Sequence, residues 1–191
     1  MVFMYLEKEK LIESFNRLDD MIRGYSLPEW DELPDIELYM DQVITLISKY
    51  LNLYHKVSNT EKSVTPSMIN NYVKLKTIPA PVKKRYSKVH LAYLLIVCTL
   101  KQTLDMSTIQ KIVPVGLTED EIKRVYTSFA RNQKKAFDYV SESIKSLAAP
   151  ILGDGNTSED IGDVIMQVSA SANFYKIMTE KITDMSSEDK D

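Results

Sequence analysis

Apolar residues recur every three or four positions along most of the chain, and this period limits its fold more than any other feature. Near the N-terminus the recurring residues are Leu11, Phe15, Leu18 and Ile22, and Gly24 follows them as a helix C-cap. This spacing gathers side chains on one face of an α-helix, whereas a half-buried strand needs alternation. The 191 residues include only 5 glycines and 7 prolines. We therefore predict an all-α fold, a helical bundle.

Helix start signals place the longer helices that follow. Pro34-Asp35 predicts the start of a helix whose apolar stripe runs to Tyr54. Thr65-Pro66 combines a hydroxyl N-cap with proline at the first helical position. Thr118-Glu119-Asp120-Glu121 matches a capping box and opens a long helix. A turn over 153–156 precedes a last helix, and the chain is expected to fray after Thr183.

Prolines interrupt the chain between two of these helices. Ile78-Pro79-Ala80-Pro81 cannot continue a helix, because each proline lacks an amide donor and disfavours helical geometry in the residue before it. We expect a loop or hairpin there. Ser87 is then predicted to cap a long apolar helix over 89–103, and Ser107 to cap a brief one that ends before Pro114.

The net charge of −3 conceals a cationic segment. The 61 residues before Lys62 have a balance of −6, and the chain after Leu104 has a balance of −5. Between these flanks, the 43 residues from Lys62 to Leu104 contain no Asp or Glu and eight basic residues: Lys62, Lys74, Lys76, Lys83, Lys84, Arg85, Lys88 and Lys101. A segment of this charge favours a polyanionic partner.

The order of elements in this segment resembles a MerR-type winged helix-turn-helix. A short helix is followed by a proline-broken basic loop, an aromatic residue, a serine cap, a long apolar helix and another short helix. The residues that carry the resemblance are Ile69-Asn70-Asn71-Tyr72, Ile78-Pro79-Ala80-Pro81, Lys84-Arg85-Tyr86-Ser87, the leucines 91, 94, 95 and 100, and Met106-Ser107-Thr108-Ile109-Gln110-Lys111-Ile112. The resemblance covers about a quarter of the chain.

A fuller pattern extends this resemblance. With Leu38-Tyr39-Met40-Asp41-Gln42-Val43 and Ile69-Asn70-Asn71-Tyr72-Val73-Lys74, the chain is similar to an uncharacterised bacterial family, a domain of unknown function known as YkrK-like. Two positions depart from the winged pattern. Lys76 stands where the resembled module usually has glycine, so we expect the turn there to differ. The span 79–86 is too short for a full wing, so we expect a stub.

Ten residues form the predicted DNA-binding site. A helix whose N-terminal part enters the major groove needs small polar side chains that reach base edges, and basic residues on the following loop would contact phosphate or the minor groove. The resemblance implies that the tyrosine of the short helix supports or contacts the sugar-phosphate backbone. The site comprises Ser67, Asn70, Asn71, Tyr72, Lys74, Lys76, Lys83, Lys84, Arg85 and Tyr86.

Each of these residues also has an ordinary structural interpretation. The basic run Lys83-Lys84-Arg85 is also typical of a solvated surface. Asn70 and Asn71 also suit a helix surface or cap, and Tyr72 also suits a core position. The sequence leaves these alternatives open.

No metal, cofactor or catalytic site is predicted, and we expect that the protein is not an enzyme. His55 and His90 have no Cys or acidic neighbour at zinc-ligand spacing. Cys98 lies in an apolar run, where a small core hydrophobe is the default role. No phosphate-binding glycine loop, nucleophile elbow or metal-binding helix motif is present.

Composition favours a cytoplasmic protein. A lone cysteine rules out an intramolecular disulfide, and residues 1–10 lack the pattern of a secretory signal. The longest apolar run, Leu91 to Leu100, spans ten residues, about half of what a membrane helix needs. The expected regions are an N-terminal helix and connector (1–34), a helix-turn-helix core (35–114), a C-terminal dimerisation or sensing region (115–183) and a disordered tail (184–191).

The leading hypothesis is a transcription regulator that recognises duplex DNA as a homodimer, because one short recognition helix covers too few base pairs for useful specificity. The apolar residues expected to form the dimer are Phe129, Phe137, Val140, Ile144, Ile165, Val168 and Phe174. A small-molecule or protein effector stays open. The alternative is a helical adaptor that binds a protein partner and uses its basic segment against an acidic surface.

Overall fold

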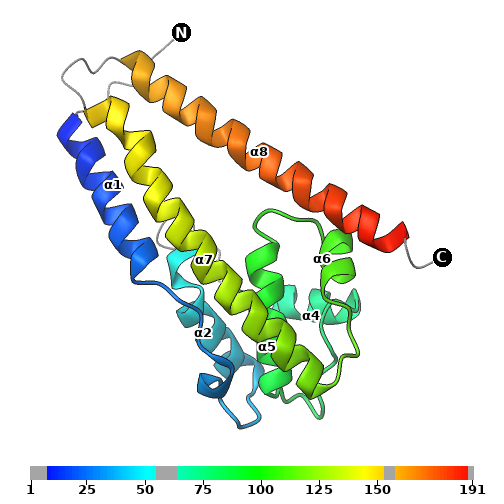
Figure 1. The fold of residues 1–191 in the computed structure, drawn as a ribbon. Coiled ribbons are helices and arrows are strands. Elements are labelled where there is room, and N and C mark those ends of the chain that lie inside the picture. Colours follow the sequence, from blue (N-terminus) through cyan, green and yellow to red (C-terminus); the bar gives the residue numbers. More distant parts are fainter. Residues whose placement is uncertain (1–7, 55–63, 153–157, 189–191) are drawn as a thin grey trace. The chain divides into compact units, whose positions relative to one another are not determined.

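A computed structural model describes residues 8–54, 64–152 and 158–188, and these residues are mainly helical, as predicted. Figure 1 shows the helices, which are α1 (Lys8–Arg23), the 3-10 helix η1 (Trp30–Glu32), α2 (Met40–Tyr50), α4 (Pro66–Lys74), α5 (Lys88–Leu100), α6 (Met106–Ile112), α7 (Glu119–Leu152) and α8 (Ser158–Glu188). Within the described ranges, β-structure is limited to two isolated bridges. The all-α prediction is therefore confirmed at the level of fold class. The turn predicted over 153–156 lies outside the described residues.

The chain forms two compact units, and α7 contributes to both. The first unit combines residues 1–25 with residues 134–182. The second combines residues 26–133 with residues 183–191. The second unit contains the whole of the predicted DNA-binding site.

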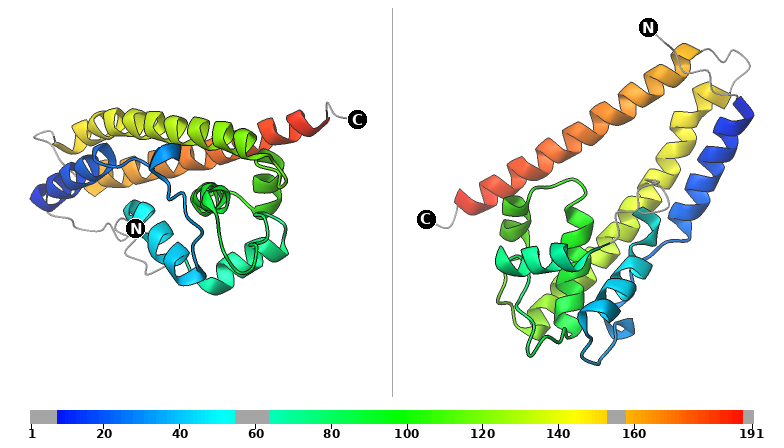
Figure 2. Two further views of the ribbon diagram at one scale, coloured as in Figure 1. Left: turned by 90° about the horizontal axis from the view of Figure 1, so that it is seen from below. Right: turned by 180° about the vertical axis from the view of Figure 1, so that it is seen from behind.

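Helix α5 is the centre of the second unit. All nine residues from His90 to Cys98 are buried, so the helix is apolar and enclosed on every side. It packs against α2, and α4, α6 and the first half of α7 lie around it (Figure 2). Ile47, Ile69, Ile109 and Ile122 from these four helices are completely buried. The long apolar helix predicted over 89–103 is confirmed, although it ends at Leu100. The core role of Cys98 is confirmed as well, and burial raises the pKa of its thiol to about 12.

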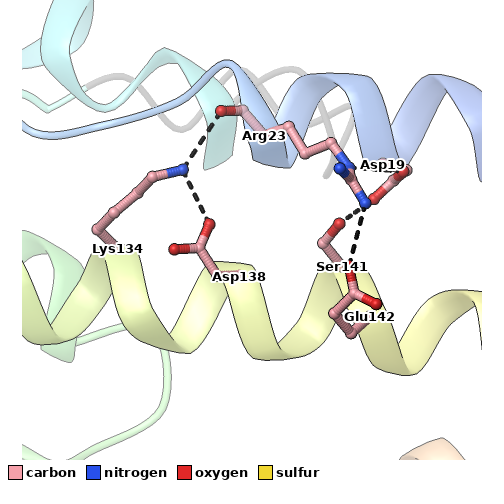
Figure 3. Close-up of polar contacts among 6 residues, drawn as sticks. All are labelled: Asp19, Arg23, Lys134, Asp138, Ser141 and Glu142. Carbon is pink, nitrogen blue, oxygen red and sulfur yellow. Dashed lines mark hydrogen bonds and ion pairs between the residues drawn. The ribbon is translucent and has the colours of Figure 1, made fainter.

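In the first unit, α1 packs along the second half of α7. The rings of Tyr25 and Phe137 meet edge-on at 5.5 Å between centroids. The Asp19 carboxylate accepts hydrogen bonds from the guanidinium of Arg23, at 2.9 Å, and from the hydroxyl of Ser141 on α7 (Figure 3). The Nζ of Lys134 lies 3.4 Å from the main-chain oxygen of Arg23. Polar contacts from α1 to α7 therefore accompany an aromatic contact made by Tyr25, just after the end of α1.

Helix α2 begins later than predicted. The sequence pattern placed its start at Pro34-Asp35, but the helix begins at Met40. The reason is a pairing with a distant segment: Leu38 and Tyr86 exchange two backbone hydrogen bonds of 2.9 Å, which hold Leu38 extended. Ile36, which the helix predicted from Pro34-Asp35 would have included, is 67% exposed.

Two further details of the prediction are wrong. Asp105, and not Ser107, caps α6, because the Asp105 carboxylate accepts a 2.8 Å hydrogen bond from the amide of Thr108 while Ser107 donates its hydroxyl to the same carboxylate. These hydrogen bonds, that from Thr108 first, lower the pKa of Asp105 to about 2. Helix α8 also continues to Glu188 instead of losing structure after Thr183, which is buried.

Candidate nucleic-acid interface

A tight hairpin turn carries two of the predicted lysines at its tip. Val82 and Arg85 form an antiparallel bridge, and the Arg85 amide donates to the Val82 carbonyl at 2.9 Å. The two residues between them, Lys83 and Lys84, have φ angles of 49° and 63°. Positive φ at both central positions is typical of the type I′ hairpin turn. The expected stub is therefore a two-residue turn.

Lysine is an unfavourable residue for this turn. Type I′ turns prefer Asn-Gly or Asp-Gly, because a side chain at positive φ crowds the following carbonyl. The left-handed conformation costs roughly 1–2 kcal/mol for an ordinary residue. Lys83 and Lys84 both carry this strain, and both side chains are exposed. Backbone strain of this kind concentrates at functional positions.

Helix α4 ends in a Schellman motif at Lys76. The Lys76 amide donates to the carbonyl of Val73 at 3.0 Å, and the Thr77 amide donates to the carbonyl of Tyr72 at 2.9 Å. Lys76 takes the left-handed position, with φ of 53°. We expected a different turn here because glycine is missing. That expectation is wrong, since the two hydrogen bonds hold lysine in the geometry that glycine adopts easily.

Helix α4 buries two side chains and exposes its small polar and basic ones, together with Met68. Its start is confirmed, because the Thr65 hydroxyl accepts a 3.2 Å hydrogen bond from the amide of Met68. Ile69 and Tyr72 face the core. The side chains predicted to read bases are all exposed, and they are Ser67, Asn70, Asn71 and Lys74. The structure therefore brings these four onto the outer surface of one short helix.

The two predicted tyrosines are core residues. Tyr72 is 5% exposed and Tyr86 is 2% exposed. Burial raises the pKa of both phenols, that of Tyr72 to about 12. The ring of Tyr86 meets His90 edge-on, with 5.6 Å between centroids. Their rings therefore anchor α4 and the hairpin to the core, and the other eight predicted residues form the exposed part of the site.

His90 ties the hairpin to the start of α5. The amide of Ser87 donates to Nδ1 of His90 at 3.0 Å, so this nitrogen carries no proton. The other ring nitrogen, Nε2, lies 3.2 Å from the carbonyl oxygen of Ala80 and donates to it. Burial lowers the pKa of His90, against smaller raising effects from the Ala80 carbonyl and Glu37. Neutral His90 thus serves as the cap of α5 and as a clamp on the loop.

Acidic residues approach the basic segment from outside it. Arg85 lies 3.7 Å from the Glu37 carboxylate and 5.1 Å from the centroid of the Tyr39 ring. Lys88 lies 3.9 Å from Asp35, and its side chain is only 12% exposed. The stretch before α2 therefore partly neutralises one side of the basic segment. Sequence reasoning missed this, because these acids precede the acid-free segment in the chain.

Gln110 of α6 is a supporting residue that sequence reasoning also missed. Its side-chain amide donates to the carbonyl of Leu75 at 2.6 Å and lies 3.3 Å from the hydroxyl of Thr77. Thr77 is completely buried. These contacts hold the turn between α4 and the hairpin. No local signal identifies these contacts, because Gln110 lies 35 residues from Leu75 and 33 residues from Thr77 in the sequence.

We call the eight exposed site residues of α4, its C-terminal turn and the 82–85 hairpin the basic edge. The fold and this basic edge define a helical protein that presents neutral polar and cationic side chains from one short helix and a hairpin. The chain belongs to the family described as Domain of unknown function (DUF1836), which matches residues 28–129. The matched range includes every residue of the basic edge. Neither the curated proteins nor the solved structures gave a match. Among the described residues, no helix has the length and apolarity to cross a membrane, and no His, Cys, Asp and Glu cluster could hold a metal ion.

Proposed function

We propose that this protein is a DNA-binding transcription regulator in which α4 enters the major groove and the 82–85 hairpin contacts the phosphate backbone. The observation that carries the proposal is the strained placement of Lys83 and Lys84 at the hairpin tip, beside a helix with an exposed polar surface. The strained turn exposes two lysines at its tip, and two exposed cations suit contact with the phosphates of an anionic partner.

The dimensions and chemistry of α4 support base reading. The helix has nine residues, so it is about 14 Å long, close to the roughly 12 Å width of the major groove. Asn70 and Asn71 carry the amide groups that pair with adenine edges, and Lys74 suits guanine or phosphate. Thr65 caps the N-terminus, and Gln110 holds the opposite end of the helix. The helix is therefore anchored at both ends.

The MerR-type resemblance supports the same proposal. Its order of a short helix, a turn, a hairpin, a long buried helix and a further short helix corresponds to α4, the 82–85 turn, α5 and α6. We therefore propose a winged helix-turn-helix with a minimal wing, of the YkrK-like kind.

A second candidate function, a protein-binding adaptor, is supported by an apolar groove. The groove has a volume of about 340 Å³, and it is lined by Pro34, Ile36, Leu38, Asp41, Gln42, Thr45, Leu46 and Lys49. Exposed Tyr39 lies next to one of its residues, Leu38, in sequence. An apolar peptide from a partner would fit such a groove. In this alternative, the basic edge would contact an acidic surface on the partner.

A binding titration at several salt concentrations tests the DNA proposal. Sequences are first selected from a random duplex pool with the full chain. The variant Lys83→Ala, Lys84→Ala, Arg85→Ala should then weaken binding to every duplex and flatten the slope of log K against log salt by roughly one unit for each phosphate that the variant no longer neutralises. The matched control, Lys123→Ala, Arg124→Ala, Arg131→Ala, removes the same charge from α7.

Two outcomes would oppose the proposal. If both triple variants weaken binding equally, net charge and not the hairpin determines affinity. If the unmodified chain binds no duplex even at low salt, where charge attraction is strongest, the adaptor becomes the better account.

A further inference from the structure

Helix α4 and its C-cap expose two large apolar side chains beside the basic edge. Met68 is 36% exposed, and Leu75, the C-cap, is 43% exposed. The helix buries Ile69 and Tyr72 in the core instead. Single apolar residues on a surface are ordinary, so only their position relative to other groups gives them significance.

Met68 lies beside Asn71. Residues three positions apart are neighbours on a helix, and both of these side chains are exposed. Met68 belongs to the first turn of α4, where its amide donates a 3.2 Å hydrogen bond to the hydroxyl of Thr65. Leu75 lies at the opposite end of the helix. The N-terminal part of α4 therefore presents an apolar side chain next to a carboxamide.

This combination matches the major-groove edge of an A·T base pair. Adenine presents an acceptor at N7 and a donor at its N6 amino group, and a carboxamide can bind both. Thymine presents a C5 methyl group, which apolar side chains contact. A G·C pair has no methyl group, and its purine presents two acceptors in that groove. Methionine suits the methyl contact, because its unbranched thioether adapts to the shape of an apolar partner.

The spacing along α4 fits contacts to adjacent bases. Met68 and Asn71 are about 4.5 Å apart along the helix axis, at 1.5 Å per residue. Successive base pairs of duplex DNA are about 3.4 Å apart. The two side chains would therefore reach one base pair or two neighbouring ones. The N-terminal residues of a recognition helix are those that contact base edges, and Lys83 and Lys84 of the hairpin tip complement the phosphates of the same duplex.

We propose that Met68 and Asn71 together read A·T base pairs, Asn71 through the edge of adenine and Met68 through the methyl group of thymine. This inference rests on the proposed function, because it requires α4 to lie in the major groove. It adds the chemical class of the target, which is a duplex with A·T pairs where the N-terminal part of α4 docks.

The first test removes single methyl groups from the DNA. Sequences selected with the full chain should contain A·T pairs, and each thymine is replaced in turn by deoxyuridine, which lacks only the C5 methyl group. Replacement of a contacted thymine should weaken binding roughly fourfold, the value expected for one group of methylene size that is no longer buried. Replacement of the other thymines should leave binding unchanged.

The second test assigns each base contact to its side chain. Met68→Ala should bind the thymine and deoxyuridine duplexes equally, yet still respond when adenine is replaced by 7-deazaadenine, which lacks the N7 acceptor. Asn71→Ala should show the reverse pattern. Leu75→Ala is the matched control, because it removes an exposed apolar side chain from the other end of the helix and should retain both responses. Circular dichroism checks that all three variants fold.

The outcomes separate this inference from the proposed function. If the chain binds a selected sequence but no thymine responds to deoxyuridine, or if folded Met68→Ala keeps the response, the inference is wrong and the DNA-binding proposal stands. Loss of the response in Leu75→Ala and not in Met68→Ala also overturns the inference. If the unmodified chain binds no duplex at low salt, both proposals are wrong.

Discussion

The side-chain amide of Gln110 donates a hydrogen bond of 2.6 Å to the carbonyl of Leu75, so α6 closes the C-terminal end of α4. Gln110→Met keeps the length of the side chain and removes the donor. We predict a decrease of roughly 1–2 kcal/mol in the free energy of unfolding, since the carbonyl loses its partner. Hydrogen exchange should accelerate at the amides of Lys76 and Thr77. Unchanged exchange at both amides would show that this bond does not hold the turn.

Relief of the hairpin strain should stabilise the fold and weaken DNA binding. Lys83→Asn with Lys84→Gly supplies the residues that a type I′ turn prefers. We predict an increase of up to roughly 1 kcal/mol per position in the free energy of unfolding, and weaker binding to every duplex with a flatter salt dependence. Thermal melts and binding titrations check the two effects. If stability falls instead, the positive φ angles do not represent strain.

A variant that conserves charge separates the effect of charge from the effect of backbone strain at the hairpin. Lys83→Arg with Lys84→Arg retains both charges and the strain. It should leave stability and duplex affinity close to those of the unmodified chain.

Specificity should depend on α4 and not on the hairpin. Asn70→Ala with Asn71→Ala should cost on the order of 1–3 kcal/mol on the selected sequence for each bidentate hydrogen-bond pair to a base that the variant cannot make, and much less on random DNA. The salt dependence should stay the same, because neither residue is charged. Competition titrations with selected and random duplexes measure the difference. An equal decrease on both would assign the two asparagines to general affinity.

Stability should fall in mild acid because of His90. Its pKa is lowered mainly by burial, so the unfolded chain binds a proton, near pH 6.5, before the folded chain does. The contribution of neutral His90 is complete above that pH and is lost as the pH falls through 6.5 toward the lower pKa of the folded state. Denaturant titrations at pH 7.5, 6.5 and 5.5 should show the decline.

A pair of histidine variants identifies the source of this decline. His90→Gln should flatten the dependence between pH 7.5 and 5.5, while His55→Gln, which removes the other histidine of the chain, should retain it. If the His55 variant flattens the profile instead, the assignment to His90 is wrong.

Local signals in the sequence determined most of the helices and their polarity. Thr65-Pro66 and the box from Thr118 to Glu121 start α4 and α7 as predicted, because capping involves residues within one turn. The continuous apolar run around Cys98 predicted the buried helix correctly. The outward position of Asn70 and Asn71 follows from the same helical period.

The tertiary structure alone decided which distant residues meet. Leu38 is extended because Tyr86 pairs with it, Arg85 is partly neutralised by Glu37, and Gln110 reaches Leu75. Helical period and capping are properties of a few consecutive residues, so the sequence expresses them directly. Contacts across the fold depend on how the buried faces pack, and no residue near Leu38 or Gln110 in the chain encodes its distant partner.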